Sequence, residues 1–187
     1  MERYENIYSK SAYVLSYELL RICFRMDHLF SVGEFNSYFL NILVKLMKEG
    51  NFQIKREASK SLTKLLVRNH YLKKRKETLQ ILKSEFGESS NSYFRLTFLH
   101  FCKKALPIIS RSFFYEHFLP LIVKMASDKV PNVRIRLSKL IPKIKRKMGN
   151  YDPQIQNQLF TILNTLSEDK DSDVQDVRFI LSQSLGC

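Results

Sequence analysis

One hydrophobic pattern recurs about every forty residues along the chain, and this repeat limits the fold more than any other feature. The residues that open the pattern follow one another at intervals of 39, 40, 39 and 41 positions: Leu15, Ile54, Phe94, Val133 and Val174. From each one, further apolar residues recur three or four positions apart, as on the buried face of an α-helix. In one unit they are Ile54, Ala58, Leu62, Leu65 and Leu66, and in another Val133, Leu137, Leu140, Ile141 and Ile144.

A second amphipathic helix is predicted before each of the last four opening residues, at about 35–48, 75–86, 111–126 and 153–167. Pro131 and Pro153 suit helix starts, where the missing N–H has no helical partner. Glycines fall at the expected helix ends, where a residue that tolerates positive φ is useful: Gly33, Gly50, Gly87, Gly149 and Gly186. Each unit is therefore a helical hairpin, which cannot bury its apolar face alone.

The sequence thus predicts an all-α fold, an α-α superhelix of about four stacked hairpins preceded by a half-repeat. The half-repeat is a helix at about 8–27 that carries Leu15, Leu19, Ile22 and Met26 on one face and lacks a partner helix. Either residues 1–7 and an external element cover it, or the chain is the end of a longer array. The predicted single domain, 1–187, divides into a half-repeat or cap at 1–34 and repeats at 35–70, 71–110, 111–149 and 150–187.

One unit carries a specific signature: Leu119-Pro120, then Asp128, then Val133-Arg134. This spacing resembles the HEAT repeat of the HEAT/armadillo-like solenoids. The resemblance implies that the proline bends the first helix, and that Asp and Arg form a hydrogen-bonded ladder between repeats. Carried to the other units, the ladder positions are Glu49, Lys55, Arg95, Asp128, Arg134 and Asp169, with Ser89 and Gln175 where two units depart from the pattern.

A narrower resemblance rests on the stretches Ser110-Arg111-Ser112-Phe113-Phe114, Phe118-Leu119-Pro120, Asn132-Val133-Arg134 and Leu140-Ile141-Pro142-Lys143. They are similar to the C-terminal repeats of scaffold-type regulatory subunits of protein phosphatase 4, over about 35–180. The resemblance implies a non-catalytic regulatory or scaffold subunit that binds a serine/threonine protein phosphatase catalytic subunit. The implied contacts lie on the turns inside each repeat: Glu49, Asn51, Glu88, Asp128, Lys129, Asn132 and Asp169.

No arrangement of residues in the sequence predicts catalysis. The histidines are scattered without the spacing that puts two metal ligands on one helix face. Cys23, Cys102 and Cys187 are far apart, and the glycines are isolated, so neither a redox motif nor a phosphate-binding loop is present. We therefore expect no enzyme activity, no cofactor and no metal. No apolar run is long enough to span a membrane, and no signal peptide is indicated.

The net charge of +13 leaves an alternative open, a solenoid that binds nucleic acid or transports cargo through a basic edge. Residues 134–147 contain seven Lys or Arg and no acid, and Lys139, Lys143 and Arg146 fall on one helix face. A solvated helix face is the default interpretation, and aromatic residues for base stacking are not interleaved. The run Lys73–Lys76, predicted in a loop, resembles a nuclear localisation signal. We expect a cytoplasmic location with nuclear entry as an alternative, protein partners, and self-association through uncovered repeat ends.

Overall fold

The computed structural model describes residues 32–69, 71–148 and 153–175, together with Val14, Leu15, Glu18, Arg21 and Ile22. Within these residues it contains helices and turns and no β-strand, so the all-α prediction is confirmed. No helix in this part of the chain is both long and apolar enough to cross a membrane. The chain forms two compact units, Met1–Gln80 and Ile81–Cys187.

In the first unit, α2 (Val32–Glu49) and α3 (Phe52–Arg68) form a helical hairpin. Leu43 and Met47 of α2 and Leu62 of α3 are fully buried. Asn51 caps α3, because its side-chain oxygen accepts a hydrogen bond of 3.0 Å from the Ile54 N–H. The helix α4 (Leu72–Ile81) follows and continues directly into a π-helical segment, η2 (Leu82–Gly87). The second unit begins at Ile81, the last residue of α4.

The turn between α2 and α3 needs a glycine because of space. A Cβ at Gly50 would lie 2.5 Å from the Leu46 carbonyl oxygen and 2.5 Å from Cγ2 of Ile54. Its φ does not lie in the positive range, so the expected need for positive φ is wrong at this position. At Gly87 a Cβ would approach Cδ1 of the flexible Leu121 side chain to 3.0 Å, while Cε2 of Phe98 and the Leu82 carbonyl oxygen would lie at ordinary contact distances of 3.5 and 3.6 Å.

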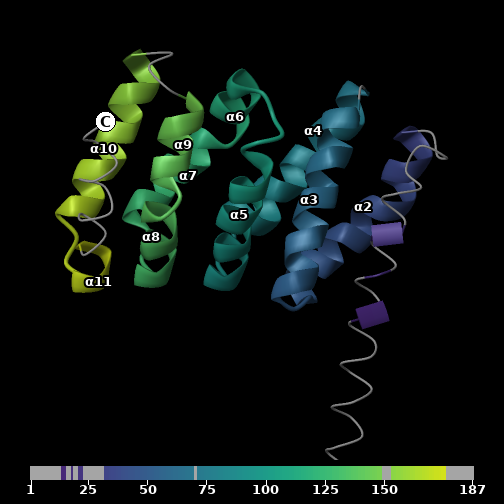
Figure 1. Ribbon diagram of the computed structural model, residues 1–187, viewed down its shortest axis with the longest axis horizontal. Coiled ribbons are helices and arrows are strands. Elements are labelled where there is room, and N and C mark those ends of the chain that lie inside the picture. Colours follow the sequence, from purple (N-terminus) through teal and green to yellow (C-terminus); the bar gives the residue numbers. More distant parts are fainter. Residues whose placement is uncertain are drawn as a thin grey trace, which may run out of the picture. The chain divides into compact units, whose positions relative to one another are not determined.

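The second unit contains the remaining helical pairs. After η2 come α5 (Ser92–Ala105), α6 (Arg111–His117), α7 (Leu119–Lys124), the short 3-10 helix η3 (Met125–Ser127), α8 (Pro131–Ser138), α9 (Ile141–Met148), α10 (Pro153–Ser167) and α11 (Ser172–Gln175). Here α8 packs against both α5 and α11, and α10 packs against α7, η3, α8 and α9. The second helices of successive repeats are therefore neighbours, as Figure 1 shows for α5, α8 and α11.

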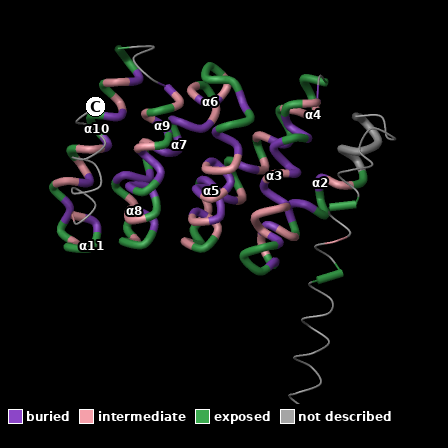
Figure 2. Tube along the Cα trace, viewed as in Figure 1, coloured by how far each residue is buried: buried purple, intermediate pink, exposed green. Residues whose placement is uncertain are grey.

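The predicted apolar stripes are buried, that of α3 in the first unit and those of α5, α8 and α9 in the second (Figure 2). Ile54, Val133 and Val174 are at most 1% exposed. Phe94 departs from the pattern, since it is half-buried and packs its ring 5.9 Å from that of Phe86. The stripe prediction therefore holds for the repeats that follow Gly50.

The predicted first stripe is wrong where it can be seen. Leu15 is 62% exposed and Ile22 is 49% exposed, while Leu19 and Met26 lie outside the described residues. Helical spacing puts residues on one face but buries them only where another helix packs against that face. Apart from Val14, Glu18 and Arg21, the rest of the predicted helix at 8–27 also lies outside the described residues, as do Gly149 and Gly186.

Proline positions interrupt both helices of the third repeat. The first helix ends at His117 and resumes as α7 with Pro120 in its first turn, as the HEAT resemblance implied. The second helix, expected to be continuous, is divided into α8 and α9 before Pro142, which has no N–H to donate to the preceding turn. Phe118 fills the first break and packs its ring 5.7 Å from Phe101 and 5.8 Å from Phe114.

The basic run Lys73–Lys76 lies in the first turns of α4 and not in a loop. Arg75 Nε donates a hydrogen bond of 3.2 Å to the Leu66 carbonyl oxygen of α3. The helix therefore begins at Leu72 and not near residue 75 as predicted. The Arg75 side chain joins α4 to α3 through this hydrogen bond.

We expect the Gly50→Ala substitution to destabilise the first unit by about 1–3 kcal/mol, because a methyl group cannot be placed beside a backbone carbonyl without moving the turn. Gly87→Ala is the matched control, since a leucine side chain can rotate away, and it should cost less. Hydrogen exchange of the α2 and α3 amides, with urea unfolding followed by circular dichroism, measures the difference. Equal effects of the two substitutions would contradict the steric explanation.

Candidate functional site

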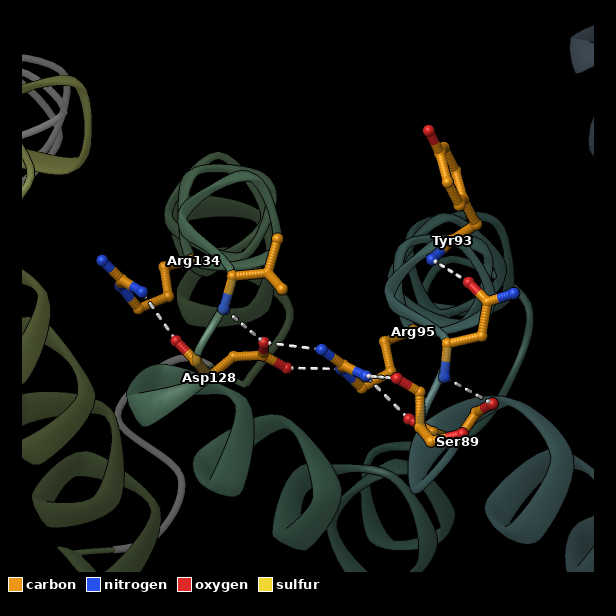
Figure 3. A network of polar contacts seen from close by, with 8 residues as sticks. Ser89, Tyr93, Arg95, Asp128 and Arg134 are labelled. Carbon is orange, nitrogen blue, oxygen red and sulfur yellow. Dashed lines mark hydrogen bonds and ion pairs between the residues drawn. The ribbon is translucent and has the colours of Figure 1, made fainter.

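The turns inside the repeats of the second unit are joined by an arginine–aspartate ladder. Arg95, in the first turn of α5, donates from Nε and Nη2 to the two carboxylate oxygens of Asp128, at 2.6 and 2.8 Å. Its Nη1 donates to the carbonyl oxygens of Ser89 and Ser90, at 2.7 and 2.9 Å. Figure 3 shows Arg95 between its own turn and the turn of the next repeat. One guanidinium thus binds two repeats together.

Arg134 repeats this geometry one repeat later. Its Nε and Nη2 donate to the carboxylate of Asp169, at 2.5 and 2.7 Å, and its Nη1 donates to the Asp128 carbonyl oxygen, at 2.6 Å. Gln175, the last residue of the short α11, holds the equivalent position, and its amide donates to the Asp169 carbonyl oxygen. In each case a carbonyl acceptor lies six residues before the donor, so the side chain bridges its own turn. Arg95 and Arg134 also bind a carboxylate of the next repeat.

The two aspartates also shape the turns that carry them. One oxygen of Asp128 accepts from the Val130 N–H at 2.9 Å, and one oxygen of Asp169 accepts from the Asp171 N–H at 2.9 Å. These contacts satisfy backbone donors just before α8 and α11, which have no helical partner. Each carboxylate therefore orders a helix start and binds the preceding repeat.

Both carboxylates are held in the charged form. Burial opposes the charge of Asp128, but hydrogen bonds from Arg95 and from the Val130 N–H outweigh it, so its pKa lies below the usual value. Hydrogen bonding by Arg134 lowers the pKa of Asp169 and, in return, raises the pKa of Arg134. The ladder side chains are 6–13% exposed. Ion pairs this well shielded from water are screened little by salt.

The ladder positions of the first unit lack these contacts. Glu49 is exposed and Lys55 is half-buried, and neither forms an ion pair among the described residues. Burial lowers the pKa of the Lys55 ammonium group. In the repeat after Lys55, Ser89 stands where the next two repeats have Asp128 and Asp169, and a serine offers no carboxylate. The ladder seen in the structure therefore runs from Arg95 to Gln175.

The residues predicted to bind a partner divide into two groups. The carboxylates of Asp128 and Asp169 are occupied within the ladder and nearly buried. The other predicted residues are exposed at helix ends, on turns or at helix starts: Glu49 and Asn51 in the first unit, and Glu88, Lys129 and Asn132 in the second. We call the exposed residues Glu88, Tyr93, Lys129 and Asn132 of the second unit the turn edge.

Tyr93 is a turn-edge residue that sequence reasoning missed. It is 73% exposed, and its ring points away from the ladder (Figure 3). Its N–H donates a hydrogen bond of 2.9 Å to the Asn91 side-chain oxygen. A signal was available, because Tyr93 follows a capping asparagine and lies outside the apolar stripe of α5. Exposed tyrosines at such positions are common contact residues in protein interfaces.

The described residues do not contain a group of three or more His, Cys, Asp or Glu side chains that could bind a metal ion. His117 packs its ring 4.5 Å from that of Phe113. Cys102 is fully buried, and burial raises the pKa of its thiol, which makes it unreactive.

No protein-family model matches the chain. Over 152 residues it is 30% identical to serine/threonine-protein phosphatase 4 regulatory subunit 4 of Mus musculus and of Homo sapiens, a match that covers 80% of this chain and 17% of each relative. Over 100 residues it is 30% identical to a regulatory subunit of protein phosphatase PP2A from Saccharomyces cerevisiae, covering 51% of this chain and 16% of that protein. The chain is a HEAT-repeat protein. It resembles regulatory and not catalytic subunits, and it spans less than a fifth of their length.

We expect the Arg134→Ala substitution to lower the free energy of unfolding of the second unit by about 2–4 kcal/mol, because it leaves Asp169 buried without its cation. The control is Lys124→Ala, which removes an ion pair with Glu88 of 3.3 Å that also joins two repeats but is 70% and 40% exposed. That change should cost less than about 0.5 kcal/mol. Urea unfolding of both variants gives the comparison, and a small loss for Arg134→Ala would show that the ladder adds little stability.

We expect the stability from the ladder to be lost in acid. Since the folded pKa values of Asp128 and Asp169 are lowered, their contribution is complete above about pH 4 and declines as the pH falls through the folded values. The double variant Asp128→Asn/Asp169→Asn should be less stable than the parent at neutral pH, and its stability should fall less between pH 5 and about pH 2. Parallel pH curves for the two proteins would refute this assignment.

Proposed function

We propose that the chain is a non-catalytic scaffold segment that binds a serine/threonine protein phosphatase catalytic subunit through its turn edge. The observation that carries the proposal is the ladder, which holds the turns of successive repeats in a fixed register with exposed side chains beside it. The similarity to phosphatase regulatory subunits supports the class of partner.

The turn edge offers the chemistry of a protein interface. Tyr93 supplies a large apolar ring with a polar end, and Glu88, Lys129 and Asn132 supply charged and amide groups around it. Because Asp128 and Asp169 are occupied in the ladder, we assign them to positioning of the turns and the exposed residues to contact. A surface held in place before binding loses less conformational entropy when a partner docks.

The test is a binding measurement between the purified chain and purified catalytic subunits of protein phosphatases 4 and 2A. We expect Tyr93→Ala and Lys129→Glu each to weaken binding at least about fivefold, a loss on the order of 1 kcal/mol. The control is Lys64→Glu, which makes the same charge change at an exposed position on a flank of α3. No binding by the parent chain, or equal losses in Lys64→Glu and Lys129→Glu, would reject the proposal.

A further inference from the structure

The second helices of the second unit carry a group of cations that the ladder does not use. Lys103 lies near the end of α5, Arg136 in α8 and Lys143 in α9, and the three form what we call the basic face. Arg136 and Lys143 are exposed, and Lys103 is half-buried. Lys103 follows Arg95 by eight residues, which is about 12 Å along a helix, so the basic face is separate from the turn edge.

Lys103 and Arg136 lie on α5 and α8, which pack against each other, and Lys143 lies on α9, which packs against α8. Burial lowers the pKa of the Lys103 ammonium group first, and the positive charges of Lys143 and Arg136 lower it further. The helices α5, α8 and α9 contain no acidic residue. Among the described residues no carboxylate forms an ion pair with Lys103, Arg136 or Lys143, so the chain leaves this charge uncompensated where it can be seen.

The stability of each helix taken alone does not explain why the three cations of the basic face lie on adjacent helices. A cation near a helix C-terminus is favoured by the helix dipole, and this explains Lys103 taken alone. It does not explain why Arg136 and Lys143, on α8 and α9 of the neighbouring repeat, add positive charge beside it without an acidic residue on either helix. An anion bound among the three would remove the repulsion.

We propose that the basic face binds an acidic polypeptide segment in extended conformation. Alternate side chains of an extended chain are roughly 7 Å apart on one face, and packed helices have axes about 8–10 Å apart. Carboxylates or phosphorylated side chains at alternate positions of such a segment therefore match cations on α5 and on the neighbouring α8 and α9. This partner is additional to the phosphatase, and its binding does not depend on the proposed function.

The described surface favours a polypeptide over nucleic acid. Single strands bind where bases stack on aromatic rings beside the cations. The strongly exposed aromatic residues described in this unit, Tyr93 and Phe160, lie instead at the turn edge and on α10. Duplex readers place a helix or a ribbon in a groove, whereas α5 and α8 lie packed side by side in a row.

The experiment is fluorescence anisotropy with a labelled peptide of alternating glutamate and serine, and with the same peptide carrying glutamine for glutamate. The full chain should bind the glutamate peptide, more weakly as salt is raised, and should not bind the glutamine peptide. The Lys103→Gln/Lys143→Gln variant should bind the glutamate peptide about tenfold more weakly. Its melting temperature should not fall, because the substitutions remove repulsion, so misfolding would not explain the loss.

The matched control is Lys45→Gln/Lys64→Gln, which removes the same charge from exposed positions of the first unit and should leave peptide affinity unchanged. An equal loss in this control would show that only net charge matters and would overturn the proposal. Absence of peptide binding, or tighter binding of a duplex or single-stranded oligonucleotide through Lys103 and Lys143, would also overturn it. Phosphatase binding by Lys103→Gln/Lys143→Gln should match that of the parent, which keeps this test separate from that of the turn edge.

Discussion

The arrangement depends on one constraint, which is that a hairpin of two amphipathic helices has more apolar surface than it can cover by itself. In the second unit α8 meets this constraint by packing against α5 on one side and α11 on the other. Its stripe residues Val133 and Leu137 are fully buried as a result. The same stripe must then reappear in the next repeat, which explains why the apolar pattern recurs about every forty residues.

Apolar packing alone does not fix the register between repeats, because it has little directional preference. The ladder fixes how the turns of neighbouring repeats are oriented relative to each other. The Arg95 guanidinium is planar and binds the Asp128 carboxylate with two parallel hydrogen bonds, which sets both distance and angle between the two turns. Desolvation offsets much of the energy of such a pair. The main contribution of the ion pair is therefore to fix the positions of the two turns. The turn-edge residues are positioned in the same way because they lie on or beside these turns.

Much of the fold could be predicted from the sequence because its signals are local and periodic. The hairpins were found from the stripes, and Pro131 and Pro153 marked helix starts. The predictions that were wrong concerned contacts between elements, which a periodic apolar pattern does not specify. Leu15 has stripe spacing but is exposed, and the need for glycine at position 50 comes from Ile54 and a carbonyl oxygen rather than from φ. The ladder columns followed from the HEAT resemblance, whereas the partners across repeats and the bonds to carbonyl groups six residues back required coordinates.

The two kinds of cation on the second helices differ in a way that suits different tasks. The ladder positions with partners in the next repeat are arginines, whose planar group can bind a carboxylate and a carbonyl oxygen at once. Two of the three residues of the basic face are lysines, which are compact charges on flexible stems and adapt to anions of varied geometry. A helix that needed positive charge only for solubility would not require arginine at the ladder positions and mainly lysine on the basic face. The division instead separates charge that holds the repeats together from charge left available for a partner.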